Sequence, residues 1–207
     1  MRPRRPQAVT PSGQSLVEFA LIVPILLILV FAMLEFGLAF NDKLTLGNAT
    51  REGARVGSAL VTGSDTSCTG DPNGVDSTIV ASVQNILRAG GSDVGLAQIH
   101  EMRIFKADSA GHQVGNYANV WRYTPGAGPD VDPGPGSEIL DFSPISVGWP
   151  ACSRQNDIDS PDSLGVRIDY EYQLQTPLGN MLAFVGGSSA SSLAIVDDTV
   201  MALNPTD

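Results

Sequence analysis

The chain is poor in the side chains from which catalytic and metal sites are built. Its 207 residues include two histidines, His100 and His112, and two cysteines, Cys68 and Cys152. Neither histidine lies in a recognisable nucleophile or metal motif, and the cysteines form no CxxC pair. The glycines near Gly126 alternate with prolines, which lack the N–H groups of a phosphate-binding loop. We therefore expect a protein that is not an enzyme and binds no cofactor or metal.

Basic residues are also few. Twelve Lys and Arg face 22 Asp and Glu, which gives a net charge of −10 at pH 7. Such a molecule repels the phosphates of nucleic acids, so we expect no nucleic-acid partner. Three of the basic residues, Arg2, Arg4 and Arg5, lie within the first five positions. By the positive-inside tendency, this end of the chain should stay in the cytoplasm.

Charge is nearly absent from the stretch 16–40, where Glu18 and Glu35 are the only charged residues. The uncharged interval Phe19–Leu34, extended to these carboxylates, approaches the roughly 30 Å thickness of a bilayer core. We expect a basic leader over 1–13 and a transmembrane helix over 14–40.

A conventional cleaved secretion signal is the alternative. The triplet Gly37-Leu38-Ala39 has the small-x-small pattern of a signal cleavage site after an apolar region. Glu18 lies where the uninterrupted apolar region of such a signal should begin, and Glu35 lies close before the cut. Both positions argue against conventional cleavage.

Glu18 is the informative charge of this stretch. A carboxylate near the start of an apolar helix costs a few kcal/mol unless it is paired or reaches the lipid headgroups. A cut after Gly13 would place the new amino group of Gln14 four positions before Glu18, where the two charges compensate each other. The alternative is that Glu18 reaches the membrane interface beside the basic tail.

After the membrane helix, residues 41–60 lack strong helix breakers and predict a helical extension. Small residues recur four apart along it, at Ala49, Gly53 and Gly57. Such a row allows close approach of another helix. Both the protein's own domain and a neighbouring subunit remain open as the packing partner.

Residues 61–207 predict an α+β domain. Apolar residues over 75–87 have helical spacing, with Asp76 or Ser77 as the N-cap. Strands are expected over 99–107, 120–123, 166–174 and 193–203, with a turn over 108–111 and a bulge or exposed edge at Asp197-Asp198. The fold class is therefore a long N-terminal helix with an amphipathic helix on a small antiparallel sheet.

Two further sites are candidates in this domain. Cys68 and Cys152 could pair in an exported protein, closing a loop of about 85 residues, although the sequence does not show that they meet. Three carboxylates gather in the segment Asp157–Asp162, but the glycine and final Glu of an EF-hand loop are lacking. We interpret this segment as a solvated turn, with calcium binding as the alternative.

The basic leader and the stretch Gly13-Gln14-Ser15-Leu16-Val17-Glu18-Phe19, with Pro24 six residues after the glutamate, resemble the type IVb prepilin pattern. Together with Arg51-Glu52-Gly53-Ala54-Arg55, they resemble the TadE-like pseudopilins of tight-adherence (Flp) pilus systems. The resemblance is specific over about residues 13–60 and general thereafter. It implies cleavage by a prepilin peptidase between Gly13 and Gln14, with Glu18 acting in peptidase recognition or subunit assembly.

Two departures from the major Flp pilin favour a minor pseudopilin. The aromatic residue is Phe19 in place of the usual tyrosine, and the domain is far longer than that of the small pilin. The resemblance implies a single-pass protein of the bacterial cytoplasmic membrane whose C-terminal, pilin-like domain is extracytoplasmic. Its expected partners are the membrane, a prepilin peptidase, other pilins or pseudopilins and the Tad secretion machinery. A TadF-like or TadG-like subtype stays open, and a signal-anchored extracytoplasmic binding module is the alternative function.

Overall fold

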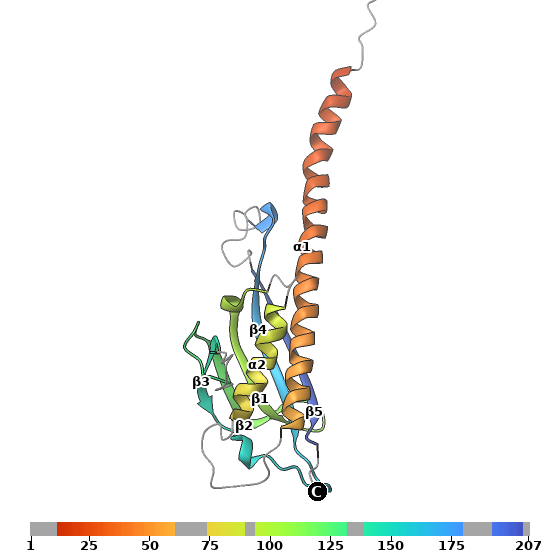
Figure 1. Ribbon diagram of the computed structural model, residues 1–207. Coiled ribbons are helices and arrows are strands. Elements are labelled where there is room, and N and C mark those ends of the chain that lie inside the picture. Colours follow the sequence, from red (N-terminus) through yellow and green to blue (C-terminus); the bar gives the residue numbers. More distant parts are fainter. Residues whose placement is uncertain (1–11, 61–73, 90–93, 132–138, 180–191, 205–207) are drawn as a thin grey trace, which may run out of the picture. The chain divides into compact units, whose positions relative to one another are not determined.

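The computed structural model describes residues 12–60, 74–89, 94–131, 139–179 and 192–204 (Figure 1). Met1–Leu38 and Leu174–Ser191 form one compact unit, and Ala39–Gln173 with Ser192–Asp207 form a second. Helix α1, Ser12–Ala59, contributes residues to both units. The predicted membrane helix and its extension are therefore one continuous helix.

Helix α1 forms because strong helix formers fill it and few residues break it. Pro24, which lacks a backbone donor, lies inside the helix, and such a proline is tolerated in an apolar span. The most apolar window of the helix is not buried in the protein. At the other end, the Leu60 N–H donates to the Val56 carbonyl at 3.1 Å.

Helix α2, Val75–Arg88, is amphipathic as predicted. Ile79, Val80, Val83 and Leu87 lie on its buried face. The prediction of a side-chain cap at Asp76 or Ser77 is wrong. The N-cap is Gly74, with φ of 65° and no side-chain cap hydrogen bond. The Asp76 carboxylate is bound instead by distant residues of the domain.

Five strands form one antiparallel sheet in the order β3-β2-β1-β4-β5. Their bounds are β1 Ile99–Ala107, β2 Gln113–Tyr123, β3 Phe142–Val147, β4 Ser163–Gln173 and β5 Ser192–Ala202. The sequence predicts three or four strands and misses β3. This short edge strand contains Pro144 and exposes its last four residues, so it has no alternating pattern to detect.

Strand β4 has the alternation that its sequence predicts. Its buried side chains include Val166, Ile168, Tyr170 and Tyr172, whereas Arg167 and Asp169 form an ion pair on the other face. Strand β1 lies beside β4, and Ile104 is paired with Val166 and Met102 with Ile168. The two central strands therefore present one continuous apolar face.

Strand β5 is an edge of the sheet, as predicted, but has no bulge. Its pairing with β4 runs without a register shift from Ser192 to Ala202. Asp197 and Asp198 point to opposite faces because successive side chains alternate in a regular strand. Asp197 then meets helix α1, and Asp198 is exposed.

The predicted turn between β1 and β2 is confirmed. Asp108 Oδ1 accepts hydrogen bonds of 2.9 Å from the N–H groups of Ala110 and His112. These bonds, the one from His112 first, hold the pKa of Asp108 below its ordinary value. Gly111 has φ of 85°, a conformation that favours glycine.

The core lies between the sheet and the two helices, which lie on the same face (Figure 1). From α1 come Leu46, Ala49 and Ala54, all fully buried. On the opposite face of the sheet, Phe105, Ala107 and Ala118 form a smaller buried cluster with Val200 packed against it. The domain thus has one helical layer and one sheet layer, the predicted α+β arrangement.

Candidate processing and assembly site

The predicted processing segment lies at the exposed start of α1. Among the described residues, no atom outside the adjoining backbone of the helix lies within 4 Å of the position that a Gly13 side chain would occupy. The Gln14 side-chain amide donates to Glu18 Oε1 at 3.0 Å, one helical turn away. Phe19 is 68% exposed. Gly13, Gln14, Glu18 and Phe19 are therefore open to another molecule.

After this segment, the surface of the helix is apolar. Its side chains are large and exposed, as with Leu21 at 69% and Leu29 at 59%. The helix is long and apolar enough to cross a membrane, and its apolar window is not buried. By length and composition it is consistent with a membrane anchor or a signal sequence.

These features define a class of protein: an exposed apolar N-terminal helix whose continuation packs on a five-stranded antiparallel sheet with a second helix, in a pilin-like α+β arrangement. Residues 13–55 match the family of TadE-like proteins, so the chain carries a TadE-like domain over these residues. No curated protein and no solved structure matches the chain.

The TadE-like domain implies a role in Tad pilus biogenesis and suggests association with the Tad pilus machinery. Proteins of this pilin-associated family are generally non-enzymatic and structural. The matched residues extend from the candidate processing segment to the part of α1 that lies on the sheet. The resemblance found in the sequence is thus confirmed over the helix that carries the site.

Glu35, the second carboxylate of the apolar stretch, is buried, with 6% of its surface exposed. Its two carboxylate oxygens accept hydrogen bonds from the backbone N–H groups of Gln175 and Thr176, at 2.8 and 2.9 Å. A buried carboxylate is costly unless it is hydrogen-bonded, and these two donors meet that need. The helix is thereby bonded to the beginning of the β4–β5 connection.

The row of small residues in the extension meets the protein's own domain. Ala49 is fully buried. A side-chain carbon added at Gly53 would lie 2.6 Å from Val83 Cγ2, and one added at Gly57 would lie 2.9 Å from Ile79 Cδ1. Both contacts are with α2, so the small residues let the two helices approach closely.

Polar contacts fix α1 on the edge strand β5 and on its neighbour β4. The Asp197 carboxylate accepts a hydrogen bond of 2.7 Å from the Thr50 hydroxyl and forms an ion pair with Lys43. Earlier in α1, the buried Asp42 carboxylate accepts a hydrogen bond of 3.0 Å from the Tyr170 hydroxyl. These bonds come from one side of the helix, so they set its rotation on the sheet.

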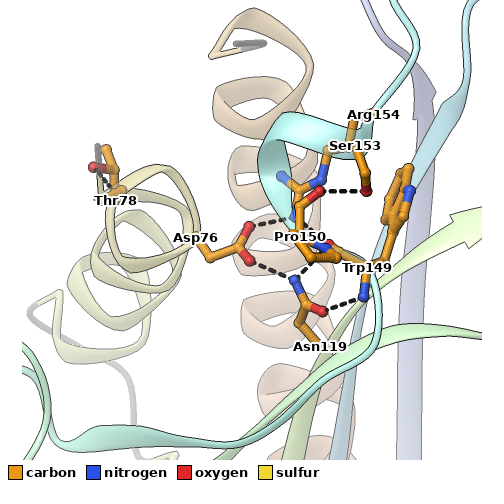
Figure 2. Close-up of polar contacts among 8 residues, drawn as sticks. Asp76, Thr78, Asn119, Trp149, Pro150, Ser153 and Arg154 are labelled. Atoms are coloured by element: carbon orange, nitrogen blue, oxygen red, sulfur yellow. Dashed lines mark hydrogen bonds and ion pairs between the residues drawn. The ribbon is translucent and has the colours of Figure 1, made fainter. Parts of the chain in front are cut away.

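A buried polar cluster joins three distant segments (Figure 2). Asp76 at the start of α2 bonds Arg154 Nη2 and the Asn119 amide, both at 2.5 Å. The Asn119 side chain also accepts from the Trp149 N–H and donates to the Trp149 carbonyl, each at 2.7 Å. Strand β2 is thus linked to α2 and to the connection between β3 and β4.

Arg154 is the most buried charge of this cluster, with 1% of its surface exposed. Its guanidinium carbon lies 4.8 Å from the centre of the Trp149 ring, a cation–π arrangement. Within the described ranges, Arg154 Nε and Nη1 have no hydrogen-bond acceptor. Asp76 and the Trp149 ring therefore supply the compensation for this charge.

The predicted disulfide has one member in the described structure. Cys152 lies on a short 3₁₀-helix, Ala151–Ser153, and is 6% exposed. Cys68 lies outside the described residues. The Cys68–Cys152 pairing therefore stays a prediction, as does its role.

One carboxylate of the acidic segment 157–162 is paired within the protein. Asp162 is 7% exposed, forms an ion pair with Lys106 at 2.7 Å and accepts a hydrogen bond from the Gln155 N–H. Among the residues that the structure describes, no group of three His, Cys, Asp or Glu could hold a metal ion. Asp162 is thus already paired with a cation of the protein.

Both histidines are exposed. His100 Nε2 lies 2.9 Å from the Glu171 carboxylate, and His112 is on the β1–β2 turn. Hydrogen bonds from Ser192 and then His100 hold the pKa of Glu171 below its usual range. Both side chains of the pair are exposed to solvent, His100 at 65% and Glu171 at 39%.

Sequence reasoning missed the roles of Glu35, Asn119 and Arg154. No sequence motif marks these residues, because their partners are far away in the chain. A single signal was present for Glu35: a carboxylate at the end of an apolar helix needs a partner.

Proposed function

We propose that the chain is a minor pseudopilin that takes part in assembly of a Flp-type adhesion pilus and is cut by a prepilin peptidase after Gly13. The carrying observation is the open segment from Gly13 to Phe19 at the start of an exposed apolar helix. A peptidase would reach the Gly13–Gln14 bond without unfolding the domain, because no side chain of the described residues covers Gly13.

Cleavage would change the partner of Glu18. In the uncut chain, the neutral Gln14 amide donates to Glu18. Hydrolysis of the Gly13–Gln14 bond would add a positive α-amino group at Gln14, one helical turn from the carboxylate. This amine could then compensate Glu18 within one helix or between neighbouring helices.

The proposed location is the bacterial cytoplasmic membrane. Arg2, Arg4 and Arg5 favour a cytoplasmic N-terminus, and the domain that follows the helix would then be extracytoplasmic. We further propose a leader over 1–13, a membrane helix over 14–40, an extension over 41–60 and a domain over 61–207. The partners would be a prepilin peptidase, other pilins and the Tad machinery.

Mass spectrometry of the membrane-extracted protein, made together with its prepilin peptidase, tests the first step. We expect a mature chain that begins at Gln14. A mature chain that begins at Met1 or Phe40 would contradict the proposal, and a start at Phe40 would indicate conventional signal cleavage.

The Glu18→Ala variant separates a pseudopilin from a plain membrane anchor. We expect loss of processing or of pilus assembly, because the carboxylate that meets the peptidase or the new amine is gone. Glu52→Ala is the matched control, since it removes a carboxylate of the same helix that is paired with Arg55 on an exposed face. Full function of Glu18→Ala would favour a signal-anchored binding module.

A further inference from the structure

Helix α1 and the β4–β5 connection are hydrogen-bonded to each other at Glu35, where the uncharged part of α1 ends. Phe19–Leu34 has no charge, and Glu35 is the next residue. Its carboxylate accepts from the Gln175 and Thr176 backbone N–H groups. The beginning of the β4–β5 connection is therefore bonded to α1 at Glu35, the residue that follows the uncharged stretch of the helix.

The exposure of α1 shows which side of the helix is covered here. Phe31 and Leu38 are partly covered and lie at helical spacing on either side of the buried Glu35. Met33 and Phe36, on other sides of the helix, are 78% and 73% exposed. Met1–Leu38 and Leu174–Ser191 form one compact unit, so the connection belongs with this part of α1.

The sequence of the connection is unusual for this acidic protein. No Asp, Glu, Lys or Arg occurs from Tyr172 to Val196, the longest such stretch of the chain. In its described part, the side chains of Gln175 and Pro177 are exposed, and that of Leu178 is partly exposed. An uncharged turn can enter the headgroup region without the cost of transferring a charge from water.

We propose that the turn Leu174–Gly179 is a second membrane-contact site, held by Glu35 against the headgroup region of a phospholipid bilayer. This inference rests on the proposed membrane location of α1, because the turn is bonded to the end of that helix. Glu35 is a positioning residue: its carboxylate holds two backbone N–H groups, and Pro177 and Leu178 contact lipid. The contact is apolar, so zwitterionic lipids suffice for it.

The test uses the full-length protein in nanodiscs of phosphatidylcholine, with and without brominated acyl chains that quench tryptophan. A Leu178→Trp reporter is read by the change in fluorescence relative to the unsubstituted protein, which contains Trp121 and Trp149. Gln175→Trp is the second reporter, because its exposed side chain can change without disturbing packing. Phe31→Trp reports separately on whether α1 is in the membrane.

We expect brominated lipid to remove most of the added fluorescence of L178W or Q175W, and Glu35→Gln to restore it. In Glu35→Gln one of the two acceptor oxygens is replaced by an NH2 group, which donates and cannot accept the backbone N–H of Gln175 or Thr176. Glu52→Gln, on the exposed face of the same helix, should leave quenching unchanged. If Glu35→Gln does not alter quenching, the positioning role of Glu35 is overturned.

The remaining outcomes separate the inference from the proposed function. Quenching of F31W without quenching of either turn reporter overturns the second contact and leaves the membrane anchor intact. Absence of quenching in F31W overturns both. If the turn reporters are unquenched by lipid but shielded from aqueous iodide when the protein self-associates, a second copy covers the turn and the membrane contact is overturned.

Discussion

Asp76 and Arg154 form the one ion pair of the described residues in which both side chains are nearly fully buried, at 2% and 1% exposure. The pair is compensated by close partners: Asp76 also binds the Asn119 amide, and Arg154 lies on the Trp149 ring. Burial of two charges costs several kcal/mol, which such contacts offset. The pair therefore stabilises the domain only as long as both members are present.

Removal of one partner should be costly. We expect Asp76→Ala to lower the free energy of unfolding by about 3–5 kcal/mol, because it leaves the Arg154 charge buried without its carboxylate. Urea unfolding of the full-length protein in detergent micelles, followed by tryptophan fluorescence, measures this change. Glu52→Ala is the control: it breaks an exposed pair with Arg55 and should cost less than about 1 kcal/mol. Equal losses in the two variants would contradict the assigned importance of the buried pair.

The residues of the site differ in how far the sequence could reveal them. The proposed role of Glu18 could be inferred from sequence because the proposed cut at Gly13, and the amine that this cut would create, lie within six residues of it. The partners of Asp76, which are Asn119 and Arg154, lie 43 and 78 residues after it along the chain. The amphipathic pattern of α2 instead suggested that Asp76 caps its own helix. Tertiary hydrogen bonds took precedence over this local preference.

At the scale of elements, α1 is one helix with two kinds of surface. Its first part exposes large apolar side chains, and its last part buries Ala49, Gly53 and Gly57 on α2 and the sheet. Close approach to α2 requires the absence of side chains at Gly53 and Gly57. The small-residue row could be read from the sequence, but its partner could not, because another helix of any subunit fits the same spacing.

The close contact makes a prediction about glycine replacement. We expect Gly53→Ala to lower the free energy of unfolding by about 1–3 kcal/mol, since the new methyl group would lie 2.6 Å from Val83 Cγ2 and the helices must separate. Gly47→Ala is the matched control in the same helix, where the nearest atom, Asp197 Oδ2, lies at an ordinary 3.6 Å. This control should be neutral or gain up to about 1 kcal/mol from helix propensity.

Thermal and urea unfolding of the two glycine variants measure the difference. If Gly53→Ala is as stable as Gly47→Ala, the α1–α2 contact accommodates the added methyl group without loss of stability, and the prediction is wrong. Normal stability of Gly53→Ala combined with failed assembly would instead favour a neighbouring subunit as the partner of this helix face.

At the scale of the whole molecule, several long-range links act on the same region. The Asp76–Arg154 pair joins the start of α2 to the β3–β4 connection, two residues after Cys152. A disulfide with Cys68, six residues before Gly74, would join the same two parts of the chain. Such a bond forms in an oxidising compartment, which agrees with the proposed extracytoplasmic domain.

We predict that the Cys68–Cys152 disulfide is present in protein extracted without reductant. The Cys68→Ser, Cys152→Ser double variant should then lose roughly 4 kcal/mol of unfolding free energy, because the unfolded chain gains the entropy of a loop of about 85 residues. Reductant should destabilise the natural protein and leave the double variant unchanged. Labelling of both thiols in the folded, unreduced protein would refute the pairing.

The sequence by itself determined the apolar helix, the amphipathic helix and the alternating strand β4. Each of these elements has a local pattern of charge or hydrophobicity that predicts its structure from residues close together in the sequence. Strand β3 was not predicted from the sequence, because a short edge strand with Pro144 has no such pattern.

Only the tertiary structure decided which partners Asp76, Arg154, Asp197 and Glu35 take. It also placed Gly53 and Gly57 against the protein's own α2 and brought the backbone N–H groups of the β4–β5 connection to Glu35. The physical reason is that these contacts join residues dozens of positions apart, so no local pattern encodes them. They form because buried charged groups need hydrogen-bond or ionic partners and a folded interior is closely packed. The groups that meet these needs come from distant parts of the chain.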